Sequence, residues 1–485
     1  MDALAAAGVT LERNYLYWYC SPSRSSLQTG RNPIAVNMNN DDMALFNPAE
    51  PTTGGYQGIP RNMTAIGNKL SAAGYQTFFF GKWHTGLATK DHTPRGRGFE
   101  KHMIYFDGAN DYWTSTSGQC GKTTITDLWK DDAPARGLNS SWACSQASHP
   151  AGSCVYEDTF FVNETLAAIA ERDPTRPFFE IWAPHNIHAP LQVPDAYLAK
   201  FAFIEDPRRQ AYAAKVNFVD DQLALVVAAL KAAGMWETTL FVLTADNGGP
   251  IYDDGEAGAN NWPLRGGKTS NHEGGIRGNG IVSGGLLPAA RRGTSETALV
   301  SIADWYPTAC ALAGVDAADA RAAAAGLPPV DGVNLWPLLS GANATPPRSE
   351  VYFGVPTISS ALSIGDPYLG VQALIRAEGA ALWKLVIGVT HQNVWTSAAY
   401  PNASTKWPNT AFDCGDAPGC LYDVAADPGE HEDVAAAHPA VAAALRARIR
   451  ELNATVYRPD RGTASPLACQ AALSKWGGFW GPFVD

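Results

Sequence analysis

The residues best suited to chemistry lie near the start of the chain, in the run from Cys20 to Arg31, Cys-Ser-Pro-Ser-Arg-Ser-Ser-Leu-Gln-Thr-Gly-Arg. Pro22 suits the first turn of a helix and Gly30 suits the position after its end, so the run predicts a short helix that begins at Cys20. The backbone dipole at a helix N-terminus favours negative charge. Cys20 is therefore a candidate nucleophile; the alternative is a buried cysteine in front of a surface helix.

Three further groups of polar residues each follow an apolar run that reads as a β-strand. A single Lys or His after a strand is usually a solvated loop residue. Ligands of open α/β sheets bind beyond the carboxyl ends of the strands, so three such groups together predict one site. The groups are Lys82 and His84 after 78–80, His185 and His188 after 179–182, and Asp246 and Asn247 after 240–244.

The elements that must position these groups alternate between apolar strands and helical patterns. This alternation predicts an α/β fold with a mostly parallel sheet flanked by helices. Gly74 is expected to end the first of the helices. The expected strands are 77–80, 177–182, 239–244 and, more weakly, 280–283, and the expected helices are 64–73 and 212–234.

The pattern changes near residue 340, where Ser340-Gly-Ala-Asn-Ala-Thr-Pro-Pro347 resembles a linker. Short strands at 350–353 and 382–387 then suggest antiparallel pairing, and 433–453 is expected to be a closing helix. We therefore expect a catalytic α/β domain over residues 1–340 and a smaller α+β domain over 341–485.

Composition narrows the function classes. The chain has 485 residues, 46% of them hydrophobic, and its 47 acidic residues outnumber 36 basic ones for a net charge of −11. This balance argues against a basic nucleic-acid-binding surface. No apolar run approaches the roughly 18–20 residues of a membrane helix, so we expect no membrane span.

Cysteines and sequons suggest the secretory pathway, with an extracellular or lysosome-like destination. Six of the eight cysteines lie in loop-like regions or the tail and could form disulfides, with the pairing left open, whereas Cys310 in an Ala-rich stretch is expected to be a core thiol. The Asn-x-Ser/Thr sites could also be ordinary loop asparagines. They are Asn62, Asn139, Asn163, Asn343, Asn402 and Asn453.

The Cys20 run resembles the signature of the sulfatase family, in which this cysteine is converted to Cα-formylglycine. The resemblance extends from residue 2 to about 340 and continues weakly into the acidic turn at 420–430. The stretches 190–194, 261–265 and 302–308 look most like the arylsulfatase B group, which includes N-acetylgalactosamine-4-sulfatase. Supporting motifs are Gly81-Lys-Trp-His84, Asp246-Asn-Gly-Gly249, Arg265-Gly-Gly-Lys268 and Glu273-Gly-Gly-Ile-Arg277.

The resemblance implies an alkaline-phosphatase-like fold and hydrolysis of sulfate monoesters, of aryl type and on a sulfated sugar. The aldehyde from Cys20 would hydrate to a geminal diol, one hydroxyl of which attacks sulfur and expels the alcohol. Deprotonation of the second hydroxyl then expels sulfate and restores the aldehyde. A serine has no second hydroxyl, which explains why a modified cysteine is used. A formylglycine-generating enzyme is then a required partner during maturation.

The family's roles transfer to matching residues of this chain. Arg24 and Lys82 would hold and polarise the diol, and His84 would accept the proton that releases sulfate. Lys268 would bind sulfate oxygens, and His188 would protonate the leaving oxygen as general acid. His185 fits less well and is interpreted as a loop or substrate-pocket residue.

The resemblance also implies one divalent cation. Asp246 and Asn247 would bind it through hard oxygens, together with the group derived from Cys20. Calcium is the family expectation and suits such ligands, with magnesium as the alternative.

The chain departs from the family at its N-terminus. Sulfatases begin with a strand that ends in a metal-binding Asp-Asp pair, and here only Met1 precedes the segment equivalent to 2–9. We therefore expect the first strand to be missing and the natural product to be longer, with a signal peptide. The other Asp-Asp pairs, none of which follows an apolar strand, are 41–42, 131–132, 220–221 and 253–254.

Two other functions remain open from the sequence. A phosphodiesterase or phosphonate hydrolase of the same superfamily would share the nucleophile but carry different metal ligands. An inactive, truncated paralogue that binds sulfated glycans would keep Cys20 as an unmodified thiol. The substrate itself is not readable, because loops form the pocket walls.

Overall fold

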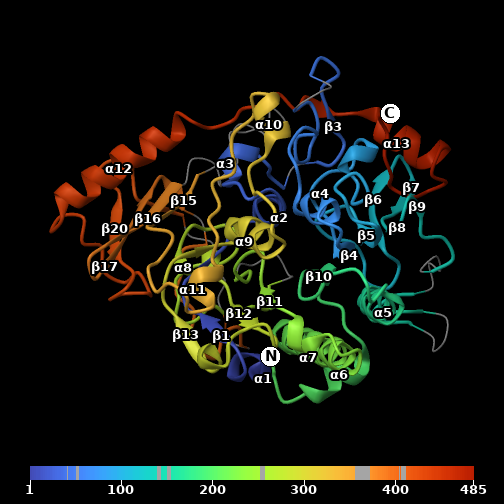
Figure 1. The fold of residues 1–485 in the computed structure, drawn as a ribbon, viewed down its shortest axis with the longest axis horizontal. Helices are drawn as coiled ribbons and strands as arrows, with labels where there is room; N and C mark the ends of the chain where they lie inside the picture. The colour runs from blue at the N-terminus through green and yellow to red at the C-terminus, as the bar shows by residue number, and fades with distance from the viewer. Residues whose placement is uncertain are drawn as a thin grey trace. The chain divides into compact units, whose positions relative to one another are not determined.

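The computed structural model describes residues 1–40, 42–50, 54–138, 144–149, 154–251, 257–354, 372–390, 392–402, 405 and 411–485 (Figure 1). The chain divides into two compact units. Unit 1 comprises Met1–Asn39, Thr238–Ala311 and Pro328–Arg458, and unit 2 comprises Asn40–Glu237, Leu312–Leu327 and Pro459–Asp485. The domain boundary expected at residue 340 stays a prediction. Asp41, the pair Asp253-Asp254 and the sequon at Asn139 lie outside the described residues.

Unit 2 contains a five-stranded sheet in the order β10-β4-β5-β8-β9. Strands β10 (Phe178–Ala183), β4 (Gln76–Lys82) and β5 (Lys101–Tyr105) are parallel, whereas β8 (Trp129–Lys130) and β9 (Ala133–Pro134) are antiparallel. The strands predicted at 77–80 and 177–182 are confirmed as β4 and β10, and they lie side by side. The polar residues that follow them therefore leave the sheet at the same edge.

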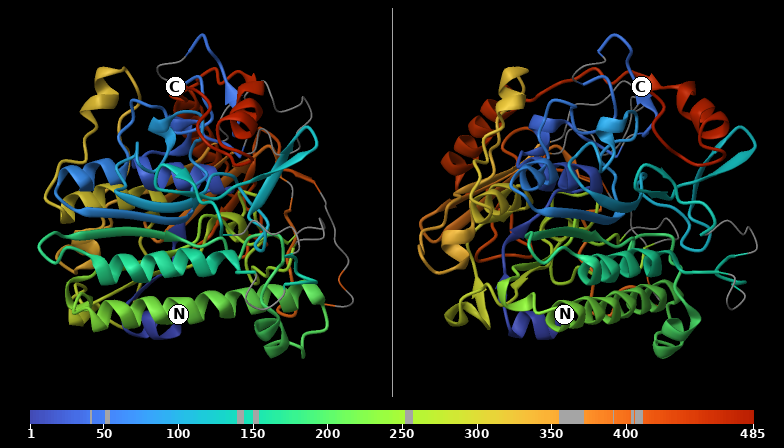
Figure 2. Two further views of the ribbon diagram at one scale, coloured as in Figure 1. Left: turned by 90° about the vertical axis from the view of Figure 1, so that its right-hand side faces the viewer. Right: turned by 45° about the vertical axis from the view of Figure 1, so that its right-hand side comes forward.

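Helices and aromatic side chains stabilise this sheet. All seven residues of β4 are buried, and Phe78 and Phe80 pack with Phe161 of α5 (Glu157–Glu171). Helix α7 (Pro207–Ala232) lies alongside α5, as Figure 2 shows. The side chain of Asp206 caps α7 by accepting from two backbone N–H groups. Among the helices of the described ranges, none is both long and apolar enough to cross a membrane.

Unit 1 contains a four-stranded sheet in the order β11-β12-β1-β13. Strands β11 (Phe241–Thr244) and β12 (Gly280–Ser283) confirm the two predicted there, and β12 is antiparallel to both β11 and β1 (Val9–Leu11). Strand β13 (Thr294–Glu296) pairs with β1 in parallel, so β12 alone runs against the other three strands of this sheet. The chain between β11 and β12 includes the four-residue helix α8 (Glu273–Ile276).

A second sheet of unit 1 follows residue 340 and is antiparallel throughout, as predicted. Its order is β15 (Glu350–Phe353), β16 (Gln372–Glu378), β17 (Ala381–Ile387) and β20 (Cys420–Asp423). Some of its apolar side chains, such as Val351 and Ile375, belong to one core with those of β1 and β12, and others, such as Leu374 and Leu385, belong to a core with those of the C-terminal helix at 439–453. The segments on the two sides of residue 340 therefore share a core within unit 1.

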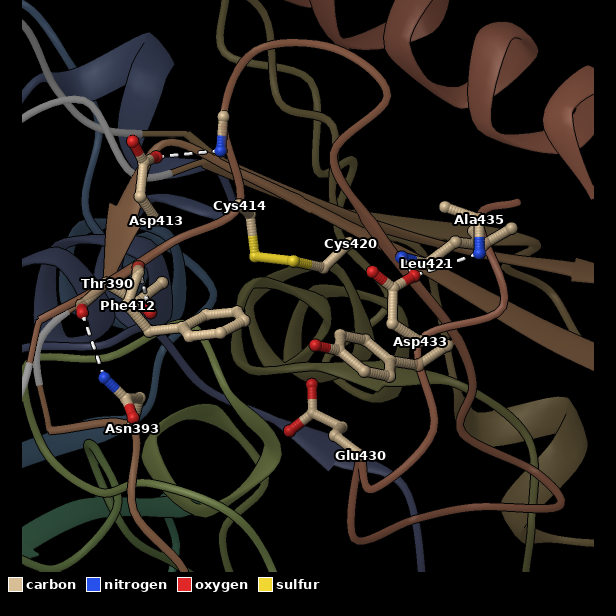
Figure 3. Close-up of a disulfide and its surroundings, with 12 residues drawn as sticks. Thr390, Asn393, Phe412, Asp413, Cys414, Cys420, Leu421, Glu430, Asp433 and Ala435 are labelled. Carbon is tan, nitrogen blue, oxygen red and sulfur yellow. Dashed lines mark hydrogen bonds between the residues drawn. A yellow bond between two sulfur atoms is a disulfide. The ribbon is translucent and has the colours of Figure 1, made fainter.

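The closing helix is shorter than predicted. Helix α12 spans Pro439–Asn453 instead of starting at residue 433. The Asp433 carboxylate accepts hydrogen bonds from Leu421 N (3.0 Å) and Ala435 N (2.9 Å), which holds the chain in a turn (Figure 3). Proline is favoured in the first turn of a helix, so the helix begins where Pro439 allows it.

Three disulfides form among the six cysteines for which pairing was expected. They are Cys120–Cys469, Cys144–Cys154 and Cys414–Cys420, the last drawn in Figure 3. Cys20 and Cys310 are buried and lie outside these disulfides. The burial of Cys310 agrees with the core thiol that the sequence predicted.

Candidate active site

The predicted site residues fall into two groups, one in each unit. Unit 1 carries Cys20, Arg24, Asp246, Asn247 and Lys268, and unit 2 carries Lys82, His84 and His188. Each group is brought together by the elements of its own unit.

Cys20 is the first residue of α2 (Cys20–Thr29) and is completely buried. The hydroxyl of Ser23 accepts from Tyr17 N at 2.8 Å, which fixes the incoming chain against the first turn. Gly30 ends the helix with φ +66°, and a Cβ there would lie 2.7 Å from the Tyr306 ring. The short helix predicted around Cys20 is confirmed, with the sulfur at its N-terminus.

Arg24 lies one turn after Cys20 and pairs with Asp246. Its Nε and one terminal nitrogen both bond Asp246 Oδ2 at 2.8 Å, and the two side chains are 16% and 24% exposed. This charge-assisted contact joins α2 to the end of β11. Both bonds end on Oδ2 of the Asp246 carboxylate.

Asp246 and Asn247 present oxygens that fit part of a cation site. Asn247 Nδ2 donates to Gly248 O at 2.8 Å, while Asn247 Oδ1 is buried without a hydrogen-bond partner among the described residues. Hard oxygens of this kind suit calcium or magnesium. No cluster of three or more His, Cys, Asp or Glu side chains that could hold a metal occurs within the described ranges. The pair therefore fits as two ligands of a site that needs more.

Lys268 lies on a loop that is bonded to both neighbouring segments. Its backbone N donates to Gly249 O at 3.0 Å, and Thr269 N donates to Trp18 O at 2.9 Å. The Lys268 ammonium lies 5.4 Å from the centre of the Tyr19 ring, directly before Cys20. Lys268 is thus held beside both the nucleophile segment and the segment that carries Asp246.

Close backbone packing around this loop depends on residues that sequence reasoning did not assign to the site. The side chain of Asn261 accepts from Gly249 N (3.1 Å) and donates to Gly249 O (2.8 Å) and Gly266 O (3.0 Å). A Cβ on Gly248 would lie 1.8 Å from Gly274 O. These residues lie within or beside the motifs that were recognised in the sequence. Which residues they contact is decided only by the folded structure.

In unit 2, Lys82 is the last residue of β4 and His84 lies two residues beyond it, and the two are 2% and 3% exposed. Gly81 allows β10 to pass close by, because a Cβ there would lie 1.8 Å from Ala183 O. His84 has φ +51°, and its N donates to Phe106 O at 3.1 Å. This unusual backbone conformation turns the chain just beyond the strand.

The His188 ring has a defined tautomer. Its Nδ1 lies 2.8 Å from Ala189 O, and a carbonyl oxygen can only accept, so Nδ1 carries a proton. Nε2 is therefore the nitrogen that can gain and release a proton. The backbone is fixed as well, because His188 O accepts from Tyr112 OH at 2.8 Å and from the Lys215 ammonium.

Lys215 is completely buried on α7 and supports this loop from within. Besides His188 O, its ammonium donates to Tyr112 OH at 2.9 Å and to Pro190 O at 2.8 Å. The ammonium also lies 4.1 Å from the centre of the Tyr112 ring. Nothing in the local sequence of the amphipathic helix distinguished this lysine from a solvated one.

His185, which was interpreted as a loop or substrate-pocket residue, is only 1% exposed, so its ring lies in the packed interior of unit 2. Its ring stacks on Tyr112 with centroids 3.7 Å apart, and Nδ1 lies 3.0 Å from Glu157 Oε2. Burial, reinforced by Lys215, lowers the pKa of His185 well below its usual value. Burial also raises the pKa of Glu157 well above its usual value, so the low-dielectric surroundings favour neutral forms of both groups.

Asp158 holds the start of the same loop. Its two carboxylate oxygens accept from His185 N at 2.7 Å and Asn186 N at 2.8 Å. Burial raises the pKa of Asp158 to about 6 although these bonds oppose the rise. In the sequence, this role is accompanied by adjacent acidic residues in the first turn of α5. Acidic residues at that position interact favourably with the helix dipole, so they did not point to a role in holding the loop.

A model of the Sulfatase family matches residues 1–315, which is more than half of the chain. The chain belongs to the sulfatase family. Mouse arylsulfatase J is 30% identical over 498 residues, covering 100% of this chain and 76% of the mouse protein. Human arylsulfatase A is 28% identical, with 92% of this chain and 81% of the human protein covered. Human N-acetylgalactosamine-6-sulfatase is 27% identical over 70% of this chain and 60% of its own.

Solved structures confirm the fold of this sulfatase. The crystal structure of Ps i-CgsB in complex with k-i-k-neocarrahexaose matches with a TM-score of 0.67 at 24% identity, covering 96% of this chain and 88% of that one. The PsFucS1 sulfatase from Pseudoalteromonas sp. matches with a TM-score of 0.64 at 20% identity, covering 96% and 86%. At these identities the likeness establishes the alkaline-phosphatase-like fold.

Membership of the family makes the protein a sulfuric ester hydrolase. Sulfatases generally use a formylglycine and a divalent cation. The assignments of individual residues to these roles stay predictions.

Proposed function

We propose that this sulfatase hydrolyses sulfate monoesters of sugars, and aryl sulfates, with a formylglycine formed from Cys20 as its nucleophile. The observation that carries the proposal is the position of Cys20 as the buried first residue of α2, with Arg24 one turn later and bonded to Asp246. The resemblance of the Cys20 run to the family signature supports the modification.

The unit 1 residues would act on the sulfate and the nucleophile. Arg24 keeps its positive charge beside Asp246 and would polarise the hydroxyl groups derived from Cys20. Lys268 would bind sulfate oxygens, because the negative charge spread over the oxygens of a sulfate ester is stabilised by nearby cations. Asp246 and Asn247 would hold a divalent cation, for which calcium is proposed and magnesium is the alternative; when bound, it would polarise the attacking hydroxyl as a Lewis acid.

The unit 2 residues would manage protons. With Nδ1 of His188 bonded to Ala189 O, the proton given to the leaving oxygen would come from Nε2. Cleavage of the bond from sulfur to that oxygen releases the alcohol and leaves the sulfate on the enzyme. His84 would then take the proton of the remaining hydroxyl, which expels sulfate and restores the aldehyde, while Lys82 would help to hold the diol.

The proposal includes maturation by a formylglycine-generating enzyme in the secretory pathway, before delivery outside the cell or to a lysosome-like compartment. The disulfides Cys120–Cys469, Cys144–Cys154 and Cys414–Cys420 support an oxidising compartment.

Mass spectrometry of the peptide that contains Cys20 tests the central step. We expect the aldehyde in the active protein and loss of aryl sulfate hydrolysis in Cys20→Ala and Lys268→Ala. Cys310→Ala is the matched control, because Cys310 is equally buried outside the disulfides, and it should keep the activity. An unmodified thiol at Cys20 in active protein, or retained activity in Cys20→Ala, would contradict the mechanism.

Comparison of rates on an aryl sulfate and the corresponding aryl phosphate separates sulfatase activity from the phosphodiester or phosphonate chemistry of the superfamily. We expect the sulfate ester to be the faster substrate. A preference for phosphate or phosphonate esters would contradict the proposed substrate class.

A further inference from the structure

The turn that follows β20 reaches back to the loop that carries Lys268. Glu430 in this turn is completely buried, and its Oε2 accepts a hydrogen bond from Glu273 N, the first residue of α8, at 2.7 Å. Its backbone has φ +55°, which is uncommon for a residue with a side chain. Figure 3 shows Glu430 on this turn, in the region of the Cys414–Cys420 disulfide. The conformation therefore directs a carboxylate onto a segment 157 residues away in the chain.

A fully buried charge cluster surrounds this contact. The Lys384 ammonium on β17 lies 2.9 Å from Glu273 Oε1 and 2.8 Å from Glu430 Oε1, and all three side chains are completely buried. Tyr15 OH donates to the other Glu273 oxygen at 2.9 Å. Burial would raise the pKa of Glu430, but Lys384 and His272 outweigh it and lower the pKa to about 2. Charges this deeply buried need fixed partners, so the cluster has little freedom to move.

Backbone hydrogen bonds connect this cluster to the candidate site. Gly274 N, in the first turn of α8, donates to Arg265 O at 2.7 Å, which closes the base of the loop that contains Lys268. Gly275 O accepts from Gly248 N at 2.8 Å, in the segment after Asp246. A shift of α8 would therefore displace the loop of Lys268 and the segment that follows β11.

The other end of the loop is held by the same part of the chain. Arg265 Nε donates to Asn393 O at 2.7 Å, and a terminal nitrogen donates to Tyr422 OH at 3.0 Å. Its guanidinium lies 4.4 Å from the centre of the Trp395 ring and 4.9 Å from that of Phe412. Both ends of the loop 265–273 are thus anchored on residues that come after position 380.

We propose that Glu430 is a positioning residue for Lys268. Through Lys384 and the start of α8 it fixes the loop 265–273, so that the Lys268 ammonium meets a sulfate oxygen without having to reorganise. The inference rests on the proposed sulfate-binding role of Lys268. A purely structural carboxylate would affect stability without any dependence on Lys268.

The test measures the affinity of the full-length protein for inorganic sulfate by calorimetric titration at fixed ionic strength. Glu430→Gln keeps the size of the side chain and removes its charge, and Glu430→Gln combined with Lys384→Met removes one charge of each sign. We expect each to weaken sulfate binding about tenfold when Lys268 is present. In a Lys268→Ala background the same changes should alter the affinity less than about twofold, because no ammonium remains to be positioned.

Asp304→Asn is the matched control, because Asp304 is a buried carboxylate of unit 1 that pairs with Arg348 and accepts from Val333 N. It should lower stability and leave sulfate affinity unchanged. Glu430 variants with normal sulfate affinity, or with equal losses in both backgrounds, would overturn the positioning role. If Lys268→Ala itself binds sulfate normally, the proposed role of Lys268 fails, and the inference fails with it. If Glu430→Gln alone does not fold, the variant that combines it with Lys384→Met is measured in its place.

Discussion

The loops that carry Lys268 and His188 are both held by a buried lysine, but the partners of that lysine differ. In unit 1, Lys384 lies between two carboxylates, those of Glu273 and Glu430. In unit 2, Lys215 donates to the carbonyl oxygens of His188 and Pro190 and to a tyrosine hydroxyl. One loop is therefore fixed by attraction between full charges and the other by hydrogen bonds to neutral acceptors.

The difference extends to the acids nearby. Lys384 keeps the pKa of Glu430 at about 2 despite burial, so this carboxylate stays ionised in mild acid. Around the His188 loop, burial dominates and raises the pKa of Asp158 to about 6 and that of Glu157 well above its usual value. The loop of Lys268, for which sulfate binding is proposed, is thus supported by an ionised carboxylate. The loop of His188, the proposed general acid, is supported by acids whose pKa values burial raises.

Lys384→Met should have the largest effect on stability. It leaves Glu273 and Glu430 facing each other in a buried site, which costs about 3–5 kcal/mol. Urea denaturation, monitored by a signal from unit 1, measures the loss in the free energy of unfolding. Lys101→Met is the control, since its pair with Glu171 is 57% and 66% exposed and should contribute less than about 1 kcal/mol. Equal costs for the two variants would refute the importance of charge pairing in the Lys384 cluster.

Lys215→Met should cost somewhat less, about 3 kcal/mol, because it leaves buried acceptors without a donor but no cluster of like charges. We also expect a lower kcat, since His188 O loses the hydrogen bond from the Lys215 ammonium. Urea denaturation and steady-state kinetics on an aryl sulfate measure the two effects. A stability loss as large as that of Lys384→Met would remove the distinction between the two loops.

Glu180→Gln tests the acid behaviour of unit 2. Burial raises the pKa of Glu180 on β10 to about 7, although Thr165 donates to it at 2.6 Å. A carboxyl with a raised pKa binds its proton more tightly in the folded state, so stability is lost as the pH rises from the ordinary pKa of 4.5 through the folded pKa of about 7. The variant should be more stable than the parent by about 2 kcal/mol at pH 8 and no more stable at pH 4.5. Thermal unfolding at the two pH values measures the difference, and a constant difference would contradict the assignment.

Tyr112→Phe should have the smallest effect, about 1 kcal/mol, because it removes one hydroxyl that donates to His188 O and accepts from Lys215. The stacking of ring 112 on His185 remains. Denaturant titration checks the magnitude, and a loss comparable to that of Lys215→Met would show that the hydroxyl, rather than the ammonium, supports the loop.

Local patterns predicted much of the fold. The helix at Cys20 follows from Pro22 and Gly30, and strands β4, β10 and β11 follow from apolar runs near their observed bounds. The start of α12 was placed too early, because Asp433 is used by a turn with Leu421 that the local sequence does not reveal. The antiparallel direction of β12 likewise depends on which strands become its neighbours.

The sequence by itself determined the family, the candidate nucleophile and the kinds of residues that surround it, since these are recorded in short motifs and in the alternation of apolar and polar runs. Tertiary structure alone decided which partners hold them. Arg24 meets Asp246 across 222 residues, and Lys384 meets Glu273 across 111. The physical reason is that a buried charge is acceptable only where folding supplies its counter-charge, and that partner is chosen by packing rather than by position in the chain.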